Sequence, residues 1–151
     1  MGVGASNAVK TITVYCRKKR DDGTVKLMRR ILKHCSWEER SISTALQTGN
    51  VLKEPASIRV FCNQSGLTYM TLHEWNTSPE ESLDEYWTVD IESPAHTLIV
   101  PYESTWEPDV GTESEVTQAE NNFIRQHPGA LRVAQINDNR QLHGAHIRLQ
   151  A

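Results

Sequence analysis

The sequence has only three cysteines, and their spacing argues against the usual cysteine-based scaffolds. Cys16, Cys35 and Cys62 are separated by 19 and 27 residues. An odd number of cysteines at these spacings fits neither a disulfide framework nor a zinc ribbon. Cys16 and Cys62 each end an alternating apolar pattern, so we expect reduced cysteines buried as packing residues. Such cysteine usage is typical of proteins made in the cytosol.

Long apolar segments are also missing. Apolar residues make up 38% of the chain, and no run approaches the roughly 20 residues of a membrane helix. We therefore expect no membrane contact. The low apolar share predicts a small core, long exposed loops or surface that only assembly covers. We expect one domain over residues 10–151 after a flexible N-terminus, residues 1–9, which lacks the order of a secretory signal.

The motifs of the common enzyme classes do not occur. The sequence contains no Gly-Lys-Ser/Thr phosphate loop, no Gly-x-Ser-x-Gly elbow and no His-Glu-x-x-His. His143 and His146 are three positions apart, which in a strand places them on opposite faces. We therefore expect no metal, no cofactor, no catalytic residue and no enzymatic activity. The alternative is an enzyme whose site these motifs do not reveal, and a pocket lined by convergent polar groups would favour it.

The charge of the chain is unevenly distributed. Residues 1–40 contain ten lysines and arginines against four acidic residues, a balance of +6, whereas residues 41–151 contain six against fifteen, a balance of -9. Such a separation favours oriented contacts with neighbouring molecules. The alternative is that the strands bring both charge sets together inside one monomer, where they pair. The sequence does not distinguish the two.

Short alternating segments predict a mostly β fold. Residues 11–16 alternate with a period of two, as in a half-buried strand, and Asp22-Gly23 predicts a hairpin turn. The return strand runs from Val25 towards Trp37, which gives a long hairpin with a basic tip. Further expected elements are strands at 58–62, 86–91, 96–102, 131–136 and 145–149, a helical turn at 71–75 and a helix at 117–126.

This pattern indicates a small closed or partly open β-barrel or sandwich with a long basic hairpin and one short helix. Trp37 and Trp87 are expected in its core, and the terminal hairpin is expected to turn at 137–140. The acidic segment 103–127 is expected to be an exposed loop apart from its helix.

The basic hairpin and the acidic segment supply the candidate contact residues. Large aromatic residues are enriched at protein interfaces, which makes Trp106, within the acidic segment, the first candidate for a subunit contact. Basic residues at a hairpin tip can also neutralise phosphates without reading bases, although the aromatic residues are not interleaved with them. The candidates are Arg17, Lys18, Lys19, Arg20, Arg29, Arg30, Trp106, Glu113 and Glu115.

A series of segments along the chain occurs in a characteristic order. These segments are 11–15, the position of Trp37, 57–60, Tyr69, 74–75, 86–89, 98–100 and 133–147. The most specific of them is the turn Asp138-Asn139-Arg140 with the strand that follows. Over about residues 10–150, this series resembles a family of short virion proteins of tailed bacteriophages that are encoded between the major capsid protein and the tail genes.

The resemblance implies a head-closure (stopper) protein in the neck of the virion, made in the host cytoplasm. It implies a ring of identical copies below the portal and adaptor and above the tail terminator, with a β-barrel core and loops near the genomic DNA. It implies no catalytic residues, and non-specific contact with the DNA is possible in such a channel. The chain departs from the family in the acidic segment 103–127.

Two alternatives remain open. One is a tail-terminator or adaptor ring of the same neck. The other is a small β-barrel nucleic-acid-binding protein built on the basic hairpin, which predicts salt-dependent binding of the free monomer to DNA.

Overall fold

The structure is a computed structural model that describes residues 9–42 and 52–151. The expected flexible N-terminus lies outside these residues except for Val9, which begins the first strand. The strands are β1 (Val9–Lys19), β2 (Val25–Ile42), β3 (Leu52–Phe61), β4 (Thr68–Tyr69), β5 (Tyr86–Trp87), β6 (Leu98–Val100), β7 (Leu131–Arg132), β8 (Gln135–Asn139) and β9 (His146–Gln150). The helices are α1 (Leu72–Thr77) and α2 (Glu113–Gln126), with short 3-10 helices η3 (Glu80–Ser82) and η4 (Pro94–His96).

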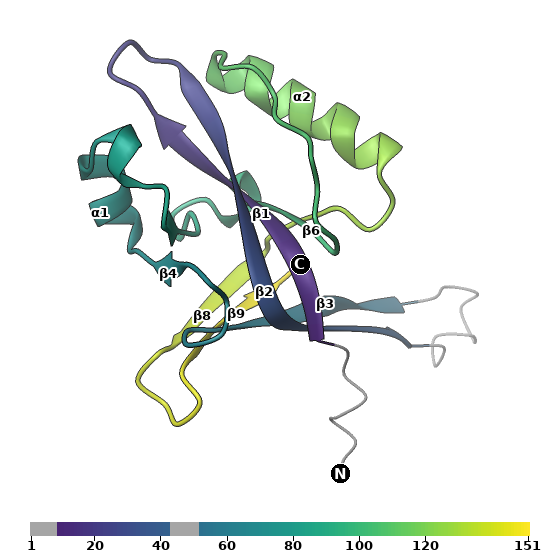
Figure 1. Cartoon of the computed structure of the whole chain (residues 1–151). Coiled ribbons are helices and arrows are strands. Elements are labelled where there is room, and N and C mark those ends of the chain that lie inside the picture. Colours follow the sequence, from purple (N-terminus) through teal and green to yellow (C-terminus); the bar gives the residue numbers. More distant parts are fainter. Residues whose placement is uncertain (1–8, 43–51) are drawn as a thin grey trace.

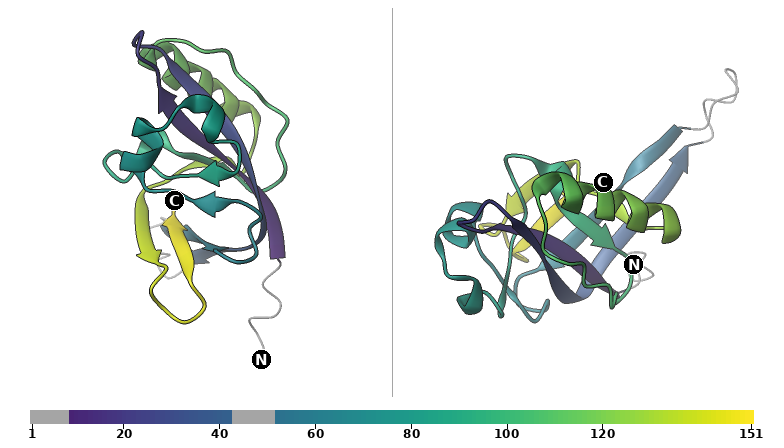
Figure 2. Two further views of the ribbon diagram at one scale, coloured as in Figure 1. Left: turned by 60° about the vertical axis from the view of Figure 1, so that its left-hand side comes forward. Right: turned by 90° about the horizontal axis from the view of Figure 1, so that it is seen from above.

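Seven strands form one antiparallel sheet in the order β7-β6-β1-β2-β3-β9-β8, and β4 and β5 form a separate parallel pair. The large sheet curls into half a barrel (Figures 1 and 2). This confirms the prediction of a mostly β, partly open barrel. The Asp22-Gly23 hairpin is also confirmed, because β1 and β2 pair from Lys19 opposite Val25 to Val9 opposite Ser36.

The two edges of the curled sheet meet where β7 leads into β8. The Val133 N–H donates to the Thr97 carbonyl at 3.0 Å, on the β6 side. The next amide, Ala134 N–H, donates to the Gln150 carbonyl of β9 at 2.6 Å. One short connection therefore joins both edges of the half-barrel.

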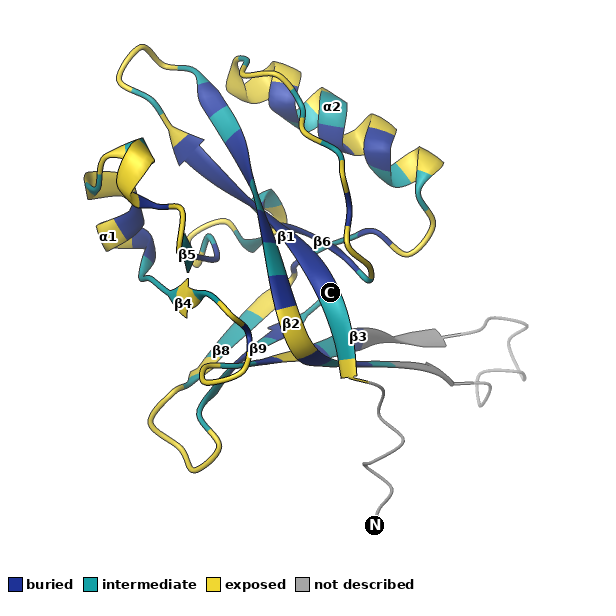
Figure 3. Cartoon of the chain, in the orientation of Figure 1, coloured by how far each residue is buried: buried dark blue, intermediate teal, exposed yellow. Residues whose placement is uncertain are grey.

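Strand β1 is buried on both faces, so the prediction of a half-buried strand is wrong. The seven residues 12–18 are all buried. Val14 and its alternate neighbours face a core that contains Trp75 and Trp87, whereas Tyr15 faces a second core formed with Phe123 of α2. The hairpin thus lies between α2 on one side and the segment containing α1 on the other (Figure 3).

Both helices begin at side-chain caps. Thr71 accepts the Glu74 N–H at 3.3 Å, which confirms the predicted turn at 71–75. Helix α2 begins at Glu113, four residues before the predicted start, because Thr112 and Glu115 form a capping box. The predicted exposed loop is therefore too long, because residues 113–115 belong to α2. Ser104, which lies within the remaining loop, is buried rather than exposed.

Other predicted boundaries shift. The strands expected at 86–91 and 96–102 contract to β5 and β6. Strand β8 continues through Asn139, so the terminal hairpin turns at 140–145 rather than at 137–140. Trp37, Trp87, Cys16 and Cys35 are buried as expected. Cys62 is exposed, contrary to expectation, because β3 ends at Phe61 and the chain turns there.

Candidate functional site

The basic residues of the β1–β2 hairpin diverge to its two sides. Side chains alternate along a strand, so Arg17 projects towards α2 and Lys18 projects towards α1. Their contacts follow this division: Arg17 meets Glu120 of α2, and Lys18 meets the backbone of Trp75 in α1. Both residues are buried, which excludes them from the exposed basic tip that the sequence predicted.

Arg17 belongs to a buried ion cluster beneath α2. One carboxylate oxygen of Glu120 contacts both Arg17 and Arg132, the latter at 3.0 Å. The Arg17 and Glu120 side chains are 4% and 0% exposed. Arg17 also donates to the Thr117 hydroxyl at 3.0 Å. Because a buried guanidinium needs a carboxylate partner, this cluster ties α2 to the sheet.

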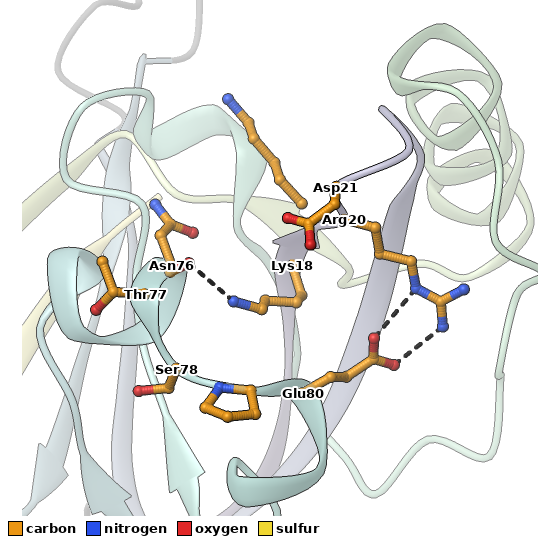
Figure 4. A pocket seen from close by; sticks show the side chains of 9 residues that line it. Lys18, Arg20, Asp21, Asn76, Thr77, Ser78 and Glu80 are labelled. Carbon is orange, nitrogen blue, oxygen red and sulfur yellow. Dashed lines mark hydrogen bonds and ion pairs between the residues drawn. The ribbon is translucent and has the colours of Figure 1, made fainter.

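Lys18 lies at a groove between the hairpin tip and the end of α1 (Figure 4). Its ammonium donates to the carbonyls of Trp75, at 2.7 Å, and Asn76, at 3.1 Å. Burial lowers the pKa of Lys18, and the nearby Glu80 and Asp21 carboxylates partly oppose this effect. The groove has a volume of about 410 Å³ and is lined by Lys18, Lys19, Arg20, Asp21, Asn76, Thr77, Ser78, Pro79 and Glu80.

Glu80 neutralises two other cations, Arg20 in the lining of this groove and Lys26 outside it. Its carboxylate accepts from Arg20 at 3.1 and 3.0 Å and pairs with Lys26 at 3.0 Å. Hydrogen bonds from Arg20 and Lys26 lower the pKa of Glu80. Among the described residues that line the groove, Lys19 is the exposed cation without an ion pair. The groove therefore has little free positive charge to attract an anionic ligand.

Arg29 and Arg30 are also engaged within the monomer. Arg29 donates to the Ser104 carbonyl at 2.8 Å and to Glu107 at 3.0 Å. Arg30 donates to the carbonyls of Tyr86 and Leu83 at 2.7 and 2.9 Å. They line a second hollow of about 330 Å³, beside the segment that carries Glu107.

The candidate residues of the acidic segment also have internal contacts. Trp106 is half-buried, stacks on Phe123 with ring centroids 4.4 Å apart, and meets Tyr15 edge to face at 5.2 Å. Glu115 caps α2 through the Thr112 backbone at 2.8 Å. Glu113 is 56% exposed and lies 3.8 Å from Arg17. Their roles as subunit contacts stay predictions.

The ion pairs of the hairpin join the two charge sets inside one monomer. This is the second of the two arrangements that the sequence left open. In each of these hairpin pairs among the described residues, the cation lies in residues 1–40 and its partner lies in residues 41–151. The pairs are Arg17–Glu113, Arg17–Glu120, Arg20–Glu80, Lys26–Glu80 and Arg29–Glu107.

A different set of arginines lies on the outer side of β3, β9 and β8. Arg59 of β3 is directly opposite Arg148 of β9, and Arg148 is opposite Asn137 of β8. Arg148 donates to the Ser57 hydroxyl at 3.0 Å. Neither guanidinium has an ion pair with a described residue, and Arg59 is exposed. We call this surface the arginine face; it comprises Arg59, Phe61, Asn137, Asn139, His146 and Arg148.

The candidate residues that the sequence predicted include neither Arg59 nor Arg148. Arg59 and Arg148 each follow a buried isoleucine, Ile58 or Ile147. That shared pattern signals outward arginines in two strands. It does not reveal that the strands are neighbours.

The buried ion cluster was also missed, although the sequence contained a signal for it. Val116, Glu120 and Phe123 lie on the buried side of α2. An acidic residue on the apolar side of a predicted helix requires a buried cationic partner. The sequence does not say that the partner is Arg17.

The described residues give little support to metal or thiol chemistry. No group of three or more histidine, cysteine, aspartate or glutamate side chains among them has the arrangement of a metal site. Burial raises the pKa of Cys16 to about 11 and that of Cys35 to about 12. These two thiols are therefore protonated at neutral pH and are weak nucleophiles. None of the described helices has the length and apolar character needed to cross a membrane.

The chain was compared with protein families, curated proteins and solved structures. A family of unknown function, DUF6751, matches residues 7–151. No curated protein and no solved structure matches the chain. Because the family match covers almost the whole sequence, the chain belongs to the DUF6751 family.

Proposed function

We propose that this chain is a structural subunit of the head–tail joint of a tailed bacteriophage. Several copies would form a ring in the neck of the virion, as a head-closure protein between the portal or adaptor and the tail terminator. The role involves no catalysis and no cofactor. Support comes from the resemblance of the segments within residues 10–150 and from one structural feature, the projecting ends of β2 and β3.

These strand ends form an arm that leaves the body of the sheet (Figures 1 and 2). Strand β1 pairs with β2 as far as Ser36. On the other side, the hydrogen bonds between β3 and the C-terminal segment that contains β9 end at Ala56. Beyond these points, the described parts of β2 and β3 pair only with each other. The pairs of the arm are Arg40 with Glu54, Ser41 with Lys53 and Ile42 with Leu52.

An arm of two strands gains much from contact with another chain. A two-stranded ribbon is only marginally stable in water. Both of its edges offer backbone N–H and C=O groups that a third strand can satisfy. A neighbouring subunit that covers the arm would supply the missing contacts. The projecting two-stranded arm is the single observation that carries the proposal of an oligomer.

Contact through an arm is compatible with a ring. The arm differs in shape from the curled body that it would meet, so the contact joins two different surfaces. Repeated contacts of this kind close a ring when the rotation between subunits permits it. The same geometry serves a tail-terminator or adaptor ring, and position within the particle separates these roles.

The first experiment measures the oligomeric state of the full chain. We expect native mass spectrometry over a concentration series to show assembly towards one closed stoichiometry, and electron microscopy to show rings. In a variant, the dipeptide Asn-Gly replaces residues 40–54. We expect this variant to remain folded by circular dichroism and to stay monomeric. Leu142→Ser, an exposed apolar residue in the β8–β9 turn, is the control and should assemble normally.

A second experiment tests the place of the protein. We expect mass spectrometry of purified tailed particles to detect the chain in a fixed ratio to the portal protein. A chain that stays monomeric at every concentration and is absent from such particles would contradict the proposed function. Assembly that persists after the arm is removed would show that the arm is not the contact.

A further inference from the structure

We propose that the arginine face binds the phosphate backbone of double-stranded DNA without reading its sequence, because Arg59 and Arg148 lie directly opposite each other on adjacent strands with no ion pair to a described carboxylate. Binding by this face is independent of ring formation. A single copy therefore tests it. In the ring proposed above, the same face would contact the DNA that passes through the neck.

The placement of the two arginines is unfavourable unless an anion is present. Residues directly opposite on antiparallel strands have Cβ atoms about 5 Å apart, and like charges there destabilise the sheet. Among the described residues on this side of the sheet, Glu38 of β2 supplies the carboxylate near the two arginines. It lies opposite Ser57, two residues along β3 from Arg59. A phosphate between the guanidiniums would neutralise both, and guanidinium groups bind phosphates with paired hydrogen bonds.

The rest of the face suits contact with a backbone. Asn137 of β8 lies opposite Arg148 on the same side of the sheet. Asn139 lies opposite His146, and the distance from Asn139 Nδ2 to His146 Nε2 is 3.1 Å. Asparagine amides commonly bind phosphate and sugar oxygens, whereas the two ring nitrogens of His146 are already engaged by Asn139 and by the Gly144 carbonyl. The face spans three neighbouring strands spaced about 4.8 Å apart. It is a sheet surface and has no projecting helix that would enter a groove, which is why we infer binding without base recognition.

The regular charge of DNA explains why we choose it over an acidic protein segment. A duplex carries one negative charge per about 1.7 Å of its axis, so it meets a row of donors in any register. A peptide must place each carboxylate individually, and tight peptide contacts usually need a buried apolar anchor. Phe61, which is half-buried, is the large apolar side chain of the arginine face.

The experiment measures the affinity of the full chain for a fluorescent duplex of mixed sequence over a series of salt concentrations. We expect micromolar-range or weaker binding that falls steeply with salt and is the same for a second, unrelated duplex. The variant R59Q/R148Q should lose on the order of tenfold in affinity per arginine at 0.1 M salt. Its plot of log affinity against log salt should be less steep by about two.

The matched control is Arg125→Gln, which removes an exposed arginine on α2, away from the arginine face. We expect its affinity to stay within about twofold of the original protein, since the lost charge is distant and screened. Thermal unfolding of R59Q/R148Q should match that of the original protein, which separates lost binding from lost folding.

Several results would overturn the inference. These are no DNA binding by the original chain, an unchanged salt dependence in R59Q/R148Q, or an equal loss in Arg125→Gln. Tighter binding to polyglutamate than to the duplex would reassign the face to an acidic protein. Loss of binding in Lys19→Gln alone would move the site to the hairpin. None of these results bears on whether the chain forms a ring.

Discussion

The molecule carries basic side chains in two regions that have different surroundings. On the β1–β2 hairpin, the basic residues are numerous in the sequence, yet Arg17, Lys18, Arg20, Arg29 and Arg30 all have partners inside the monomer. On the arginine face there are only two arginines, and both lack an ion pair with a described residue. A dense basic segment in the sequence is therefore a poor measure of the positive charge that a partner meets.

The difference arises from what covers each region. The hairpin lies between α2 and the α1 segment, and both bring carboxylates or carbonyl oxygens to it. The arginine face is the outer side of a sheet, where strand neighbours determine the contacts. Buried cations must find partners because an unpaired charge in the interior is costly. Exposed cations are hydrated and can remain free for a ligand.

The largest effect is expected for Glu120→Gln. It removes the negative charge shared by Arg17 and Arg132 and leaves the buried Arg17 guanidinium with only the exposed Glu113 carboxylate, 3.8 Å away. We expect the free energy of unfolding to fall by about 3–5 kcal/mol, measured by urea denaturation. Glu113→Gln is the control, since that side chain is 56% exposed and its loss should cost about 1 kcal/mol or less. Equal effects of the two variants would contradict the comparison.

A smaller loss is expected for Lys18→Met. The variant keeps the apolar stem but leaves the carbonyls of Trp75 and Asn76 without their donor. We expect a cost of about 1–3 kcal/mol at neutral pH. The control is Lys19→Met, which removes an exposed lysine at the adjacent position and should cost less than about 0.5 kcal/mol.

The pH dependence gives a second measurement on Lys18. Because burial lowers its pKa in the folded protein, the unfolded chain binds more protons between that lowered value and the ordinary lysine value of 10.5. The Lys18 contribution to stability therefore rises with pH across this alkaline window. We expect Lys18→Met to lack this contribution when its unfolding free energy is compared with that of the original protein from pH 8 upward. An identical pH profile would show that Lys18 is not buried in solution.

The next effect concerns Glu80, a partly exposed carboxylate. Arg20 and Lys26 lower its pKa below the ordinary value of 4.5, so its contribution to stability is present above 4.5 and is lost as the pH falls through the lowered value. We expect Glu80→Gln to cost at most about 1 kcal/mol at neutral pH. The difference between variant and original should vanish on acidification. A difference that persists at the lowest pH would have a cause other than charge.

The smallest effect, with the opposite sign, is expected for Arg59→Gln. The change relieves the repulsion between Arg59 and Arg148 and breaks no hydrogen bond between Arg59 and another described residue. We expect the free energy of unfolding to be unchanged or to rise by up to about 0.5 kcal/mol. A loss above about 1 kcal/mol, measured by the same denaturation, would mean that Arg59 has a stabilising partner.

Local signals in the sequence predicted much of the fold. Asp22-Gly23 identified the hairpin, Thr71 identified the start of α1, and alternation identified β3 and β9. The burial of both faces of β1 was not predictable in this way. Its second face contains Thr13, Tyr15 and Arg17, whose polar groups predict a face exposed to solvent. They become buried because Ser104 and α2, about 90 to 100 residues further on, cover them.

The candidate sites depended even more on distant parts of the chain. The sequence located the basic residues of the hairpin, but it did not reveal that Arg17 and Lys18 point to opposite sides or which carbonyl and carboxylate oxygens contact them. Arg59 drew no attention because it stands alone in an ordinary strand. Its significance arises only when β3 pairs with β9, which places Arg148 opposite it.

The connection between β7 and β8 has a mechanical consequence. The amide of Val133 bonds to Thr97, beside β6, and the amide of Ala134 bonds to Gln150 of β9, so the two sides of the half-barrel cannot separate at this connection unless at least one of these bonds breaks. A load applied to β8 is then passed to β6 as well as to β9. The strands of the body should respond to tension as one unit, and simultaneous hydrogen exchange at these two amides would report their release.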